Sequence, residues 1–280
     1  MEQDSTNLID MSVIIPAHNE ADYIIACLIA LTEQTNAPAN VEILLSANAC
    51  TDETVSRAIQ TQPAFEQRGW TFRVLTSTTP GKLFALNCAD GAALGKVLVY
   101  LDADVLCGPN LLGQVHTALD TDRALYATGK LKIAKAKSWI THAYGRFWAA
   151  LPFVQGQAVG AGFFAVNRAG RARWGTFPNI ISDDTFVRLQ FEPNERVEVP
   201  EIYTWPLVEG FKNLVKVRHR QDRGVTEIDD LYPGLRNRED KPEAMLKTII
   251  LNDLLGFAIY ASVKLAVRLR SSDDKWTRGR

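Results

Sequence analysis

The stretch Val97-Leu98-Val99-Tyr100-Leu101-Asp102-Ala103-Asp104 decides the fold. Its first five residues favour a β-strand, and an uninterrupted apolar run is typical of a parallel strand that is buried on both faces. Two aspartates follow, separated by one small residue. Ligands of open parallel sheets bind beyond the carboxyl ends of the strands. The stretch therefore predicts a strand that delivers Asp102 and Asp104 to a binding crevice.

The segments around this strand alternate between two kinds of pattern. Short apolar runs predict strands, and apolar residues at helical spacing predict helices. The predicted strands lie at residues 11–15, 41–45, 72–75 and 160–166, and the predicted helices at 21–34, 51–60, 83–93, 111–119, 138–153 and 182–190. We interpret the aromatic residues of 138–153 as core; the alternative is that they stack on an acceptor sugar or a lipid. The alternation before Pro109 predicts an α/β fold with a Rossmann-like, mostly parallel sheet flanked by helices.

The composition is that of an ordinary globular protein. Of the 280 residues, 46% are hydrophobic and 22% charged, and the formal net charge is −1. A dedicated nucleic-acid binder would be strongly basic, so that class is excluded. The four cysteines form no CxxC pair, which disfavours a zinc site and suits a reducing compartment. Residues 1–10 lack the basic and apolar regions of a signal peptide, and we expect a cytoplasmic protein.

Polar residues follow the predicted strands at one edge of the sheet. Asn48 and Asp52 come after the second strand, Lys82 after the third, and Asp102 and Asp104 after the fourth. Neighbouring carboxylates repel each other, and Mg²⁺ or Mn²⁺ commonly binds such oxygens together with phosphates. A lysine can neutralise a diphosphate. Together these residues indicate a metal-assisted nucleotide-diphosphate site, although each one alone also fits a solvated turn, a surface lysine or a helix cap.

Four ordered stretches resemble the nucleotide-binding half of a family-2 glycosyltransferase with the GT-A fold. They are SVIIPAHNE (12–20), ANACTDET (47–54), PGKLFALN (80–87) and VLVYLDADV (97–105). The resemblance continues to about Gly224. It implies that the nucleotide base, ribose and diphosphate are held by Pro16, Glu20, Asn48, Asp52 and Lys82. It also implies that Asp104 is the direct metal ligand, while Asp102 lies nearer the ribose or a metal-bound water and is a second metal candidate. By their positions in the sequence, His18 is a further candidate for the nucleotide and His219 for the metal or a phosphate; each alternatively fits a surface histidine.

The second half resembles the acceptor side of the same family. Residues Gly160, Ala161 and Gly162 match a glycine-containing strand near the donor sugar and the acceptor. Asp183 and Asp184 match the acidic pair that carries the catalytic base, and the alignment makes Asp184 that base. A neighbouring carboxylate raises the pKa of an acid, which suits a proton acceptor. The alternative is a helix start at Ser182 with two acids in the first turn.

Residues 217–221, VRHRQ, occupy the place of the QxxRW motif of processive family members. Arg218 and Arg220 fit its arginines and would contact the diphosphate, whereas the leading glutamine and the tryptophan are missing. This departure predicts a non-processive enzyme. The alternative for these residues is a solvated basic loop.

The C-terminal segment is predicted to form an appendage from about Asp240. Its uncharged core, Leu254 to Val263, is too short to span a membrane. Residues 264–280 contain six Lys/Arg and two Asp, which would attract an anionic membrane surface. We therefore expect peripheral contact through residues 246–280 at the inner face of the membrane; the alternative is a helix packed on the domain. The predicted regions are 1–10 (tail), 11–105 (donor half), 106–239 (acceptor and catalytic half) and 240–280 (appendage).

The predicted function is a metal-dependent, inverting transfer of a sugar from a nucleotide-diphosphate donor, by default a UDP-sugar. The acceptor is a hydroxyl on a glycan, a lipid-linked molecule or a small molecule. One alternative is a non-catalytic nucleotide-sugar-binding protein. A nucleotidyltransferase is a second alternative, but it would have a glycine-rich loop where this chain has Pro16–Glu20.

Overall fold

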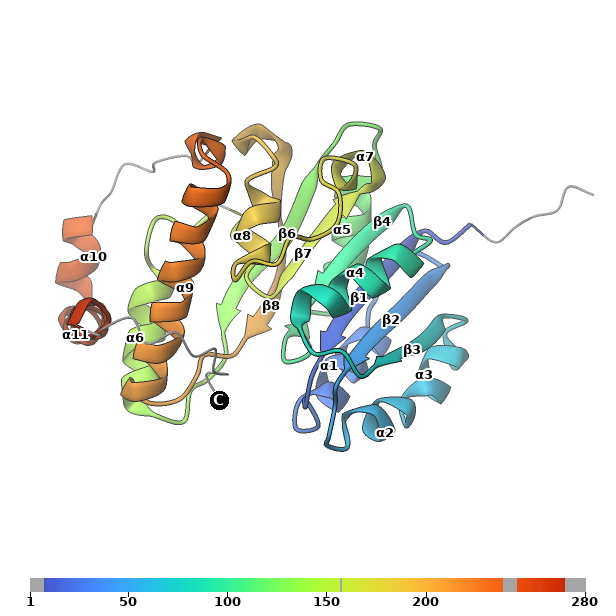
Figure 1. Cartoon of the computed structure of the whole chain (residues 1–280), viewed down its shortest axis with the longest axis horizontal. Coiled ribbons are helices and arrows are strands. Elements are labelled where there is room, and N and C mark those ends of the chain that lie inside the picture. The colour runs from blue at the N-terminus through green and yellow to red at the C-terminus, as the bar shows by residue number, and fades with distance from the viewer. Residues whose placement is uncertain (1–7, 157, 239–245, 270–280) are drawn as a thin grey trace, which may run out of the picture.

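The computed structural model describes residues 8–156, 158–238 and 246–269 of the chain. Within them an eight-stranded sheet has the order β3-β2-β1-β4-β7-β6-β8-β5 and runs through the centre of the molecule (Figure 1). The strands are β1 (Met11–Ala17), β2 (Val41–Asn48), β3 (Thr71–Ser77), β4 (Val97–Leu101), β5 (Leu106–Cys107), β6 (Tyr126–Ile133), β7 (Phe163–Asn167) and β8 (Arg196–Trp205).

Helices lie on both faces of the sheet. They are α1 (Ile24–Thr32), α2 (Thr54–Ile59), α3 (Gln62–Gln67), α4 (Lys82–Ala92), α5 (Leu111–Leu119), α6 (Trp139–Ala149), α7 (Arg168–Arg171), α8 (Asp183–Arg188), α9 (Phe211–Leu231), α10 (Leu246–Asn252) and α11 (Leu254–Leu269), with short 3-10 helices η1 (Pro193–Glu195) and η2 (Leu235–Arg238). Every strand and helix predicted from the sequence is present, with ends shifted by a few residues.

The first four strands form the parallel sheet that the alternation predicted. In the register, Val13 of β1 lies opposite Ile43 of β2 on one side and Val99 of β4 on the other. All residues of β1, β2 and β4 are buried, as expected for strands that helices cover on both faces. The carboxyl ends of these strands therefore lie at one edge of the sheet.

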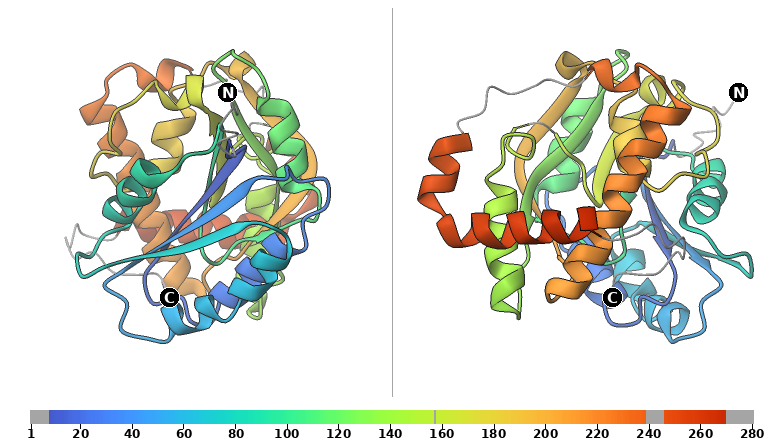
Figure 2. Two further views of the ribbon diagram at one scale, coloured as in Figure 1. Left: turned by 90° about the vertical axis from the view of Figure 1, so that its right-hand side faces the viewer. Right: turned by 60° about the vertical axis from the view of Figure 1, so that its left-hand side comes forward.

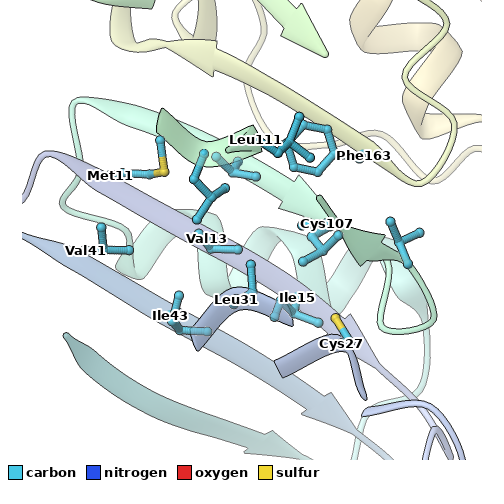
Figure 3. Packing of buried hydrophobic residues seen from close by; sticks show 14 of the residues in the cluster. Met11, Val13, Ile15, Cys27, Leu31, Val41, Ile43, Cys107, Leu111 and Phe163 are labelled. Carbon is cyan, nitrogen blue, oxygen red and sulfur yellow. The ribbon is translucent and has the colours of Figure 1, made fainter. Parts of the chain in front are cut away.

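Two hydrophobic cores fill the two sides of the sheet. Figure 3 shows the first, in which Met11, Val13 and Ile15 of β1 pack with α1 and α5. On the other face, Ile14 and Leu44 pack with residues of α4 and α8. The alternation of side chains along β1 thus divides its residues between the two cores.

The second half of the sheet contains strands that the sequence did not reveal. β7 is antiparallel to β4 and β6, β6 and β8 are parallel, and β5 pairs antiparallel with β8. Charged residues in β6 and β8, and Pro200 within β8, hide their strand character. A bulge after Gly129 also interrupts the register of β6 with β8. Only the packing against β7 and α5 brings these strands into the sheet.

Residues 217–221 do not form the basic loop considered above. They lie inside α9, a helix of 21 residues that buries Leu214, Val215, Gly224 and Ile228. Most other positions of α9 are polar or charged, so the narrow apolar stripe was not recognised as a helix from the sequence. This correction changes the direction in which each arginine of the segment points.

The C-terminal helices form one end of the molecule. α11 lies across α6 and α9, and packs against both (Figure 2). Among the described residues no single helix is long and apolar enough to cross a membrane; α10 and α11 pass that test only as a pair bent by 112°. The predicted boundary near Asp240 and the basic tail after Leu269 lie outside the described residues, as do residues 1–7 of the predicted N-terminal tail.

Candidate functional site

Side chains at the ends of β1 and β2 tie the neighbouring loops together. His18 Nδ1 donates to the carbonyl oxygen of Asn48 at 2.8 Å. The amide of Asn48 in turn donates to the carbonyl oxygens of Gly81, at 2.9 Å, and Thr79, at 3.3 Å. Asn48 is buried, and among the described residues its Oδ1 has no hydrogen-bond partner. Asn48 therefore fixes the loop that leads to Lys82.

Asp52 connects the start of α2 with the loop after β1. Its carboxylate accepts from the backbone amides of Ala21, at 3.2 Å, and Thr54, at 3.0 Å. The hydroxyl of Thr54 accepts from the backbone amide of Glu20 at 2.7 Å. Slight burial acts against ionisation, but these hydrogen bonds hold the pKa of Asp52 below its ordinary value. Asp52 thus holds the start of α2 against the loop after β1, at the same edge of the sheet as Glu20.

Lys82 joins the two halves of the molecule. Its ammonium lies 2.9 Å from Asp102 Oδ1, at the end of β4, and 3.1 Å from Asp183 Oδ2, at the start of α8. Burial opposes the charge of Lys82, but the carboxylates of Asp102, Asp183 and Asp184 outweigh it and raise the pKa of the ammonium. The fold therefore brings together a lysine and the aspartates that the sequence had assigned to separate roles.

Asp184 differs electrostatically from Asp183. Burial and the neighbouring carboxylate of Asp183 raise the pKa of Asp184 to about 6, against the opposing effect of Lys82. Its Oδ1 accepts from the backbone amide of Thr185 at 2.6 Å. Ser182 precedes α8 but makes no side-chain capping hydrogen bond. The pair thus lies in the first turn of α8, as the helix-start alternative expected, and Asp183 is in addition turned toward Lys82.

The segment 160–162 lies against the aspartates that follow β4. The carbonyl oxygen of Gly162 accepts from the backbone amide of Asp102 at 2.8 Å. Gly162 has a φ of +75°, and a Cβ there would lie 2.8 Å from Val105 Cγ2 and 2.9 Å from Trp205 Cδ1. Gly160 also has a positive φ, +67°. Only glycine fits this close approach, which positions the segment beside Asp102.

Trp205 lies beside the glycine segment and was not named in the sequence analysis. It ends β8, stands beside Gly162 and packs against Trp148 with ring centroids 5.8 Å apart. β8 itself was not predicted, so nothing pointed to its last residue. An aromatic ring at a strand end next to the glycine segment is the signal that could have found it.

The metal candidates do not converge. Among the described residues no three or more His, Cys, Asp or Glu side chains are grouped around one point. His219 lines a groove with Ile181, Asp222 and Arg223, and neither Asp102 nor Asp104 contributes to that groove. Among the described residues His219 therefore forms no three-residue metal group with Asp102 and Asp104, and the two aspartates remain the carboxylate candidates. Two carboxylates completed by phosphate oxygens fit Mg²⁺ or Mn²⁺, because these ions commonly bind in that way.

The two arginines of residues 217–221 point in different directions. Arg218 pairs with Asp222 at 2.7 Å, and Asp222 also pairs with Lys264 of α11 at 2.9 Å. Arg218 thus lies at the junction of α9 with α11, a position that does not favour the expected contact with a diphosphate.

Arg220 lies one turn before Gly224, on the face of α9 that approaches α8. A Cβ at Gly224 would lie 3.0 Å from Ile181 Cβ, just before the acidic pair. The Nε atoms of Arg218 and Arg220 are both buried without a hydrogen-bond partner among the described residues, so the position of Arg220 beside α8 is what distinguishes it. Arg220 therefore stays a candidate for the site.

The remaining predicted site residues differ in exposure. Pro16 is buried within β1, opposite Ser46 of β2, so it lies inside the sheet edge. Ala161 is buried as well. Glu20, His18, Asp102 and Asp104 are partly exposed. These four side chains border the open side of the strand ends.

Comparisons with known proteins bear on the family and the fold of the chain. The profile of glycosyl transferase family 2 matches residues 12–172. The glycosyltransferase AglE of Haloferax volcanii is 33% identical over 100 residues, which are 36% of this chain and 31% of that protein. The match thus spans about a third of the length of the curated relative.

Similar solved structures include three nucleotide-sugar enzymes. A mannosyltransferase of Pyrobaculum calidifontis with GDP-Man and Mn²⁺ is 21% identical, with a TM-score of 0.56 over 91% of this chain and 73% of that one. TarS of S. aureus with UDP is 14% identical, with a TM-score of 0.54 over 91% and 71%.

The third is glucosyl-3-phosphoglycerate synthase of Mycobacterium tuberculosis with Mn²⁺, UDP-Glc and glycerol 3-phosphate. It is 17% identical, with a TM-score of 0.53 over 83% of this chain and 82% of that one. These similarities show the fold, which is the GT-A fold expected from the resemblance. The family profile covers more than half of the sequence, and the chain belongs to glycosyl transferase family 2.

Proposed function

We propose that the protein transfers a sugar from a nucleotide-diphosphate donor to an acceptor hydroxyl, with inversion at the anomeric carbon. The observation that carries this proposal is the contact of Lys82 with both Asp102 and Asp183. This contact connects the sheet edge where we place the nucleotide with the acidic pair that contains the proposed general base. Similar structures hold UDP, UDP-Glc or GDP-Man, and we take a UDP-sugar as the default donor.

The donor diphosphate would lie beyond the end of β4. We assign Lys82 and Arg220 as the cations that bind the diphosphate. Lys82 contacts Asp183 directly, and Arg220 belongs to α9, which packs on the residues just before Asp183. His18 and Glu20 border the same edge and would face the nucleoside. Gly160, Ala161 and Gly162 would lie near the sugar, because the carbonyl oxygen of Gly162 is bonded to Asp102.

Asp184 is our candidate for the general base. Its raised pKa lets it accept a proton near neutral pH while remaining largely ionised beforehand. The proton of the acceptor hydroxyl passes to the carboxylate of Asp184 as the acceptor oxygen forms a bond to the anomeric carbon. The bond from that carbon to the diphosphate oxygen breaks on the opposite face, and the nucleoside diphosphate leaves with the electron pair. Asp183, held by Lys82, would position its neighbour.

Asp104, with Asp102 beside it, would hold Mg²⁺ or Mn²⁺. The ion would supply positive charge to the departing diphosphate. Lys82 already neutralises Asp102, so Asp104 is the more suitable of the two for direct coordination. The Mn²⁺ in two of the similar structures supports this assignment.

The first test is donor turnover by the purified protein with a panel of UDP-, GDP- and dTDP-sugars, with Mg²⁺, with Mn²⁺ and with chelator. We expect release of one nucleotide that stops without metal and falls at least about 100-fold in Asp104→Ala and in Asp184→Asn. Asp122→Ala and Asp122→Asn are matched controls at an exposed loop position and should behave as the wild type.

Two results would contradict the proposal. Metal-dependent donor binding by calorimetry without turnover, in the presence of a panel of hydroxyl acceptors, would indicate a nucleotide-sugar-binding protein instead. Full activity of Asp184→Asn would show that another group is the base. The acceptor, a glycan, a lipid-linked molecule or a small molecule, is to be identified from the same panel, and release of products with one added sugar would support non-processive transfer.

A further inference from the structure

Helix α11 is apolar on its outward face as well as on its packed face. Gly256, Val263 and Val267 are buried against the rest of the molecule. On the opposite side of the helix, Leu254 is 61% exposed and Leu265 is 58% exposed. A surface helix of a globular protein ordinarily places polar residues outward, so this pattern is unusual.

Helix α10 extends the apolar surface. The exposed leucines of the two helices, which we call the outer apolar face, are Leu246, Leu251, Leu254, Leu255, Leu265 and Leu269. Both helices stand at the end of the molecule away from β3 (Figures 1 and 2). Exposed apolar side chains gathered on two neighbouring helices are typical of a contact with a membrane or a partner.

The outer apolar face belongs to a firmly held helix. Asp253, at the bend between α10 and α11, accepts from Arg146 Nε at 2.8 Å and Nη2 at 2.7 Å. Further along, Lys264 pairs with Asp222 of α9 at 2.9 Å. Tyr260 also packs on Tyr144 and Phe147 of α6. The inner face of α11 is therefore well packed, and the leucines are exposed because they lie on its opposite face.

The dimensions favour a helix lying in the plane of a membrane surface. At 1.5 Å per residue, the 16 residues of α11 are about 24 Å long, shorter than a hydrocarbon core of about 30 Å. The bend of 112° prevents α10 from continuing the span. An interfacial helix needs only one apolar face toward the acyl chains, which the outward leucines provide.

The charge of the segment selects the kind of lipid. Arg268 is exposed beside the outer apolar face, and in the sequence residues 265–280, without the paired Lys264, contain five Lys/Arg and two Asp. Basic residues beside an apolar helix are attracted to anionic headgroups. A protein partner or a second copy of the chain would need a matching acidic and apolar surface, and the charge of this segment favours lipid over both.

We propose that the outer apolar face docks the protein on an anionic bilayer, as a peripheral protein at the inner face of the membrane. The leucines enter the headgroup region while α6 and α9 hold the catalytic domain against the surface. The proposal goes beyond the transfer reaction and does not depend on it, since binding is measured without donor or acceptor.

The test is flotation of the full chain with vesicles of phosphatidylcholine alone or mixed with phosphatidylglycerol. We expect binding to the mixed vesicles that weakens with salt. The triple variant Leu254→Gln, Leu265→Gln, Leu269→Gln should bind about 100-fold more weakly, since three leucines no longer enter the interface. A matched control, Ile59→Gln, Leu94→Gln, Leu231→Gln, changes three leucine or isoleucine side chains that are 48%, 68% and 57% exposed elsewhere, and should bind as the wild type.

Circular dichroism checks that the variants fold. If the triple variant does not fold, the single variant Leu265→Gln replaces it, and we expect that variant to bind about 5-fold more weakly than the wild type. Equal binding by the wild type and the Leu265 variant would overturn the proposal, as would wild-type binding that ignores phosphatidylglycerol. Concentration-dependent dimers that disappear in the triple variant, without vesicle binding, would assign the face to a second copy of the chain and also overturn it.

Discussion

Lys82 Nζ lies 3.1 Å from Asp183 Oδ2, although the two residues are 101 positions apart in the chain. The contact connects the start of α4 with the start of α8. The side chain of Asp183 is only 6% exposed, so its carboxylate depends on this cation. The pairing makes the two halves of the site interdependent.

Replacement of Lys82 should therefore affect stability as well as activity. We expect Lys82→Met to lower the free energy of unfolding by about 2 kcal/mol, because Asp183 loses its cation while remaining buried. Urea denaturation measures the change. Lys96→Met is a control, since Lys96 is 62% exposed and 3.9 Å from Asp10, and should stay within about 0.5 kcal/mol of the wild type. Adding Asp183→Asn to Lys82→Met should recover part of the loss; no recovery would contradict the coupling.

The activity should depend on the ionisation of Asp184. Its pKa of about 6 predicts that kcat/KM falls about tenfold for each pH unit below that value and levels off above it. The pH profile of nucleotide release measures this. Asp184→Glu should keep an acidic limb, while Asp184→Asn should lose it along with most of the activity. An unchanged acidic limb in Asp184→Asn would assign the limb to another group.

The same pKa predicts an effect on stability. The ordinary value for the acid is 3.8, so the folded protein favours protonated Asp184. This stabilisation is complete below about pH 4 and is lost as the pH rises through about 6. Asparagine imitates the neutral acid at every pH. The free energy of unfolding of Asp184→Asn should therefore be about 2 kcal/mol higher than that of the wild type near pH 8. Near pH 4 the two free energies of unfolding should be nearly equal. Thermal melts at both pH values measure this difference. A wild type that is more stable than Asp184→Asn near pH 8 would contradict the prediction.

Gly162 should tolerate no side chain. We expect Gly162→Ala to cost about 1–3 kcal/mol, because φ is +75° and the new Cβ would meet Val105 and Trp205. It should also reduce activity, since the carbonyl oxygen of Gly162 holds the amide of Asp102. Gly175→Ala is the matched control, as nothing lies within 4 Å of a Cβ there. Denaturation midpoints and donor turnover for the two variants should separate; equal values would argue against the close packing.

Arg218 and Arg220 should give opposite results. Arg218→Met breaks the pairing with Asp222 beside α11 and should lower stability by about 1 kcal/mol with little change in donor KM. Arg220→Met should leave the melting temperature nearly unchanged and reduce kcat/KM about 10- to 100-fold, as expected for a residue that binds the diphosphate. If Arg218→Met lost as much activity as Arg220→Met, the inference that the two side chains point in different directions would be contradicted.

Much of the first half of the chain could be predicted because its signals are local. The apolar run Val97–Leu101 and the aspartates after it belong to one short segment, and their position at a strand end follows from the segment alone. The second half was harder. β6 and β8 carry charged residues, and α9 has only a narrow apolar stripe, so their structure depends on packing partners distant in sequence.

The sequence by itself determined the parallel sheet, the edge at which Asp102 and Asp104 lie, and the acidic pair at the start of α8, because strand and helix periodicity are properties of consecutive residues. Only the tertiary structure decided that Lys82 bridges Asp102 and Asp183, that Arg218 turns away from the strand ends while Arg220 lies near α8, and that the leucines of α11 face outward. These relationships depend on how helices pack on a finished sheet, which no local pattern specifies.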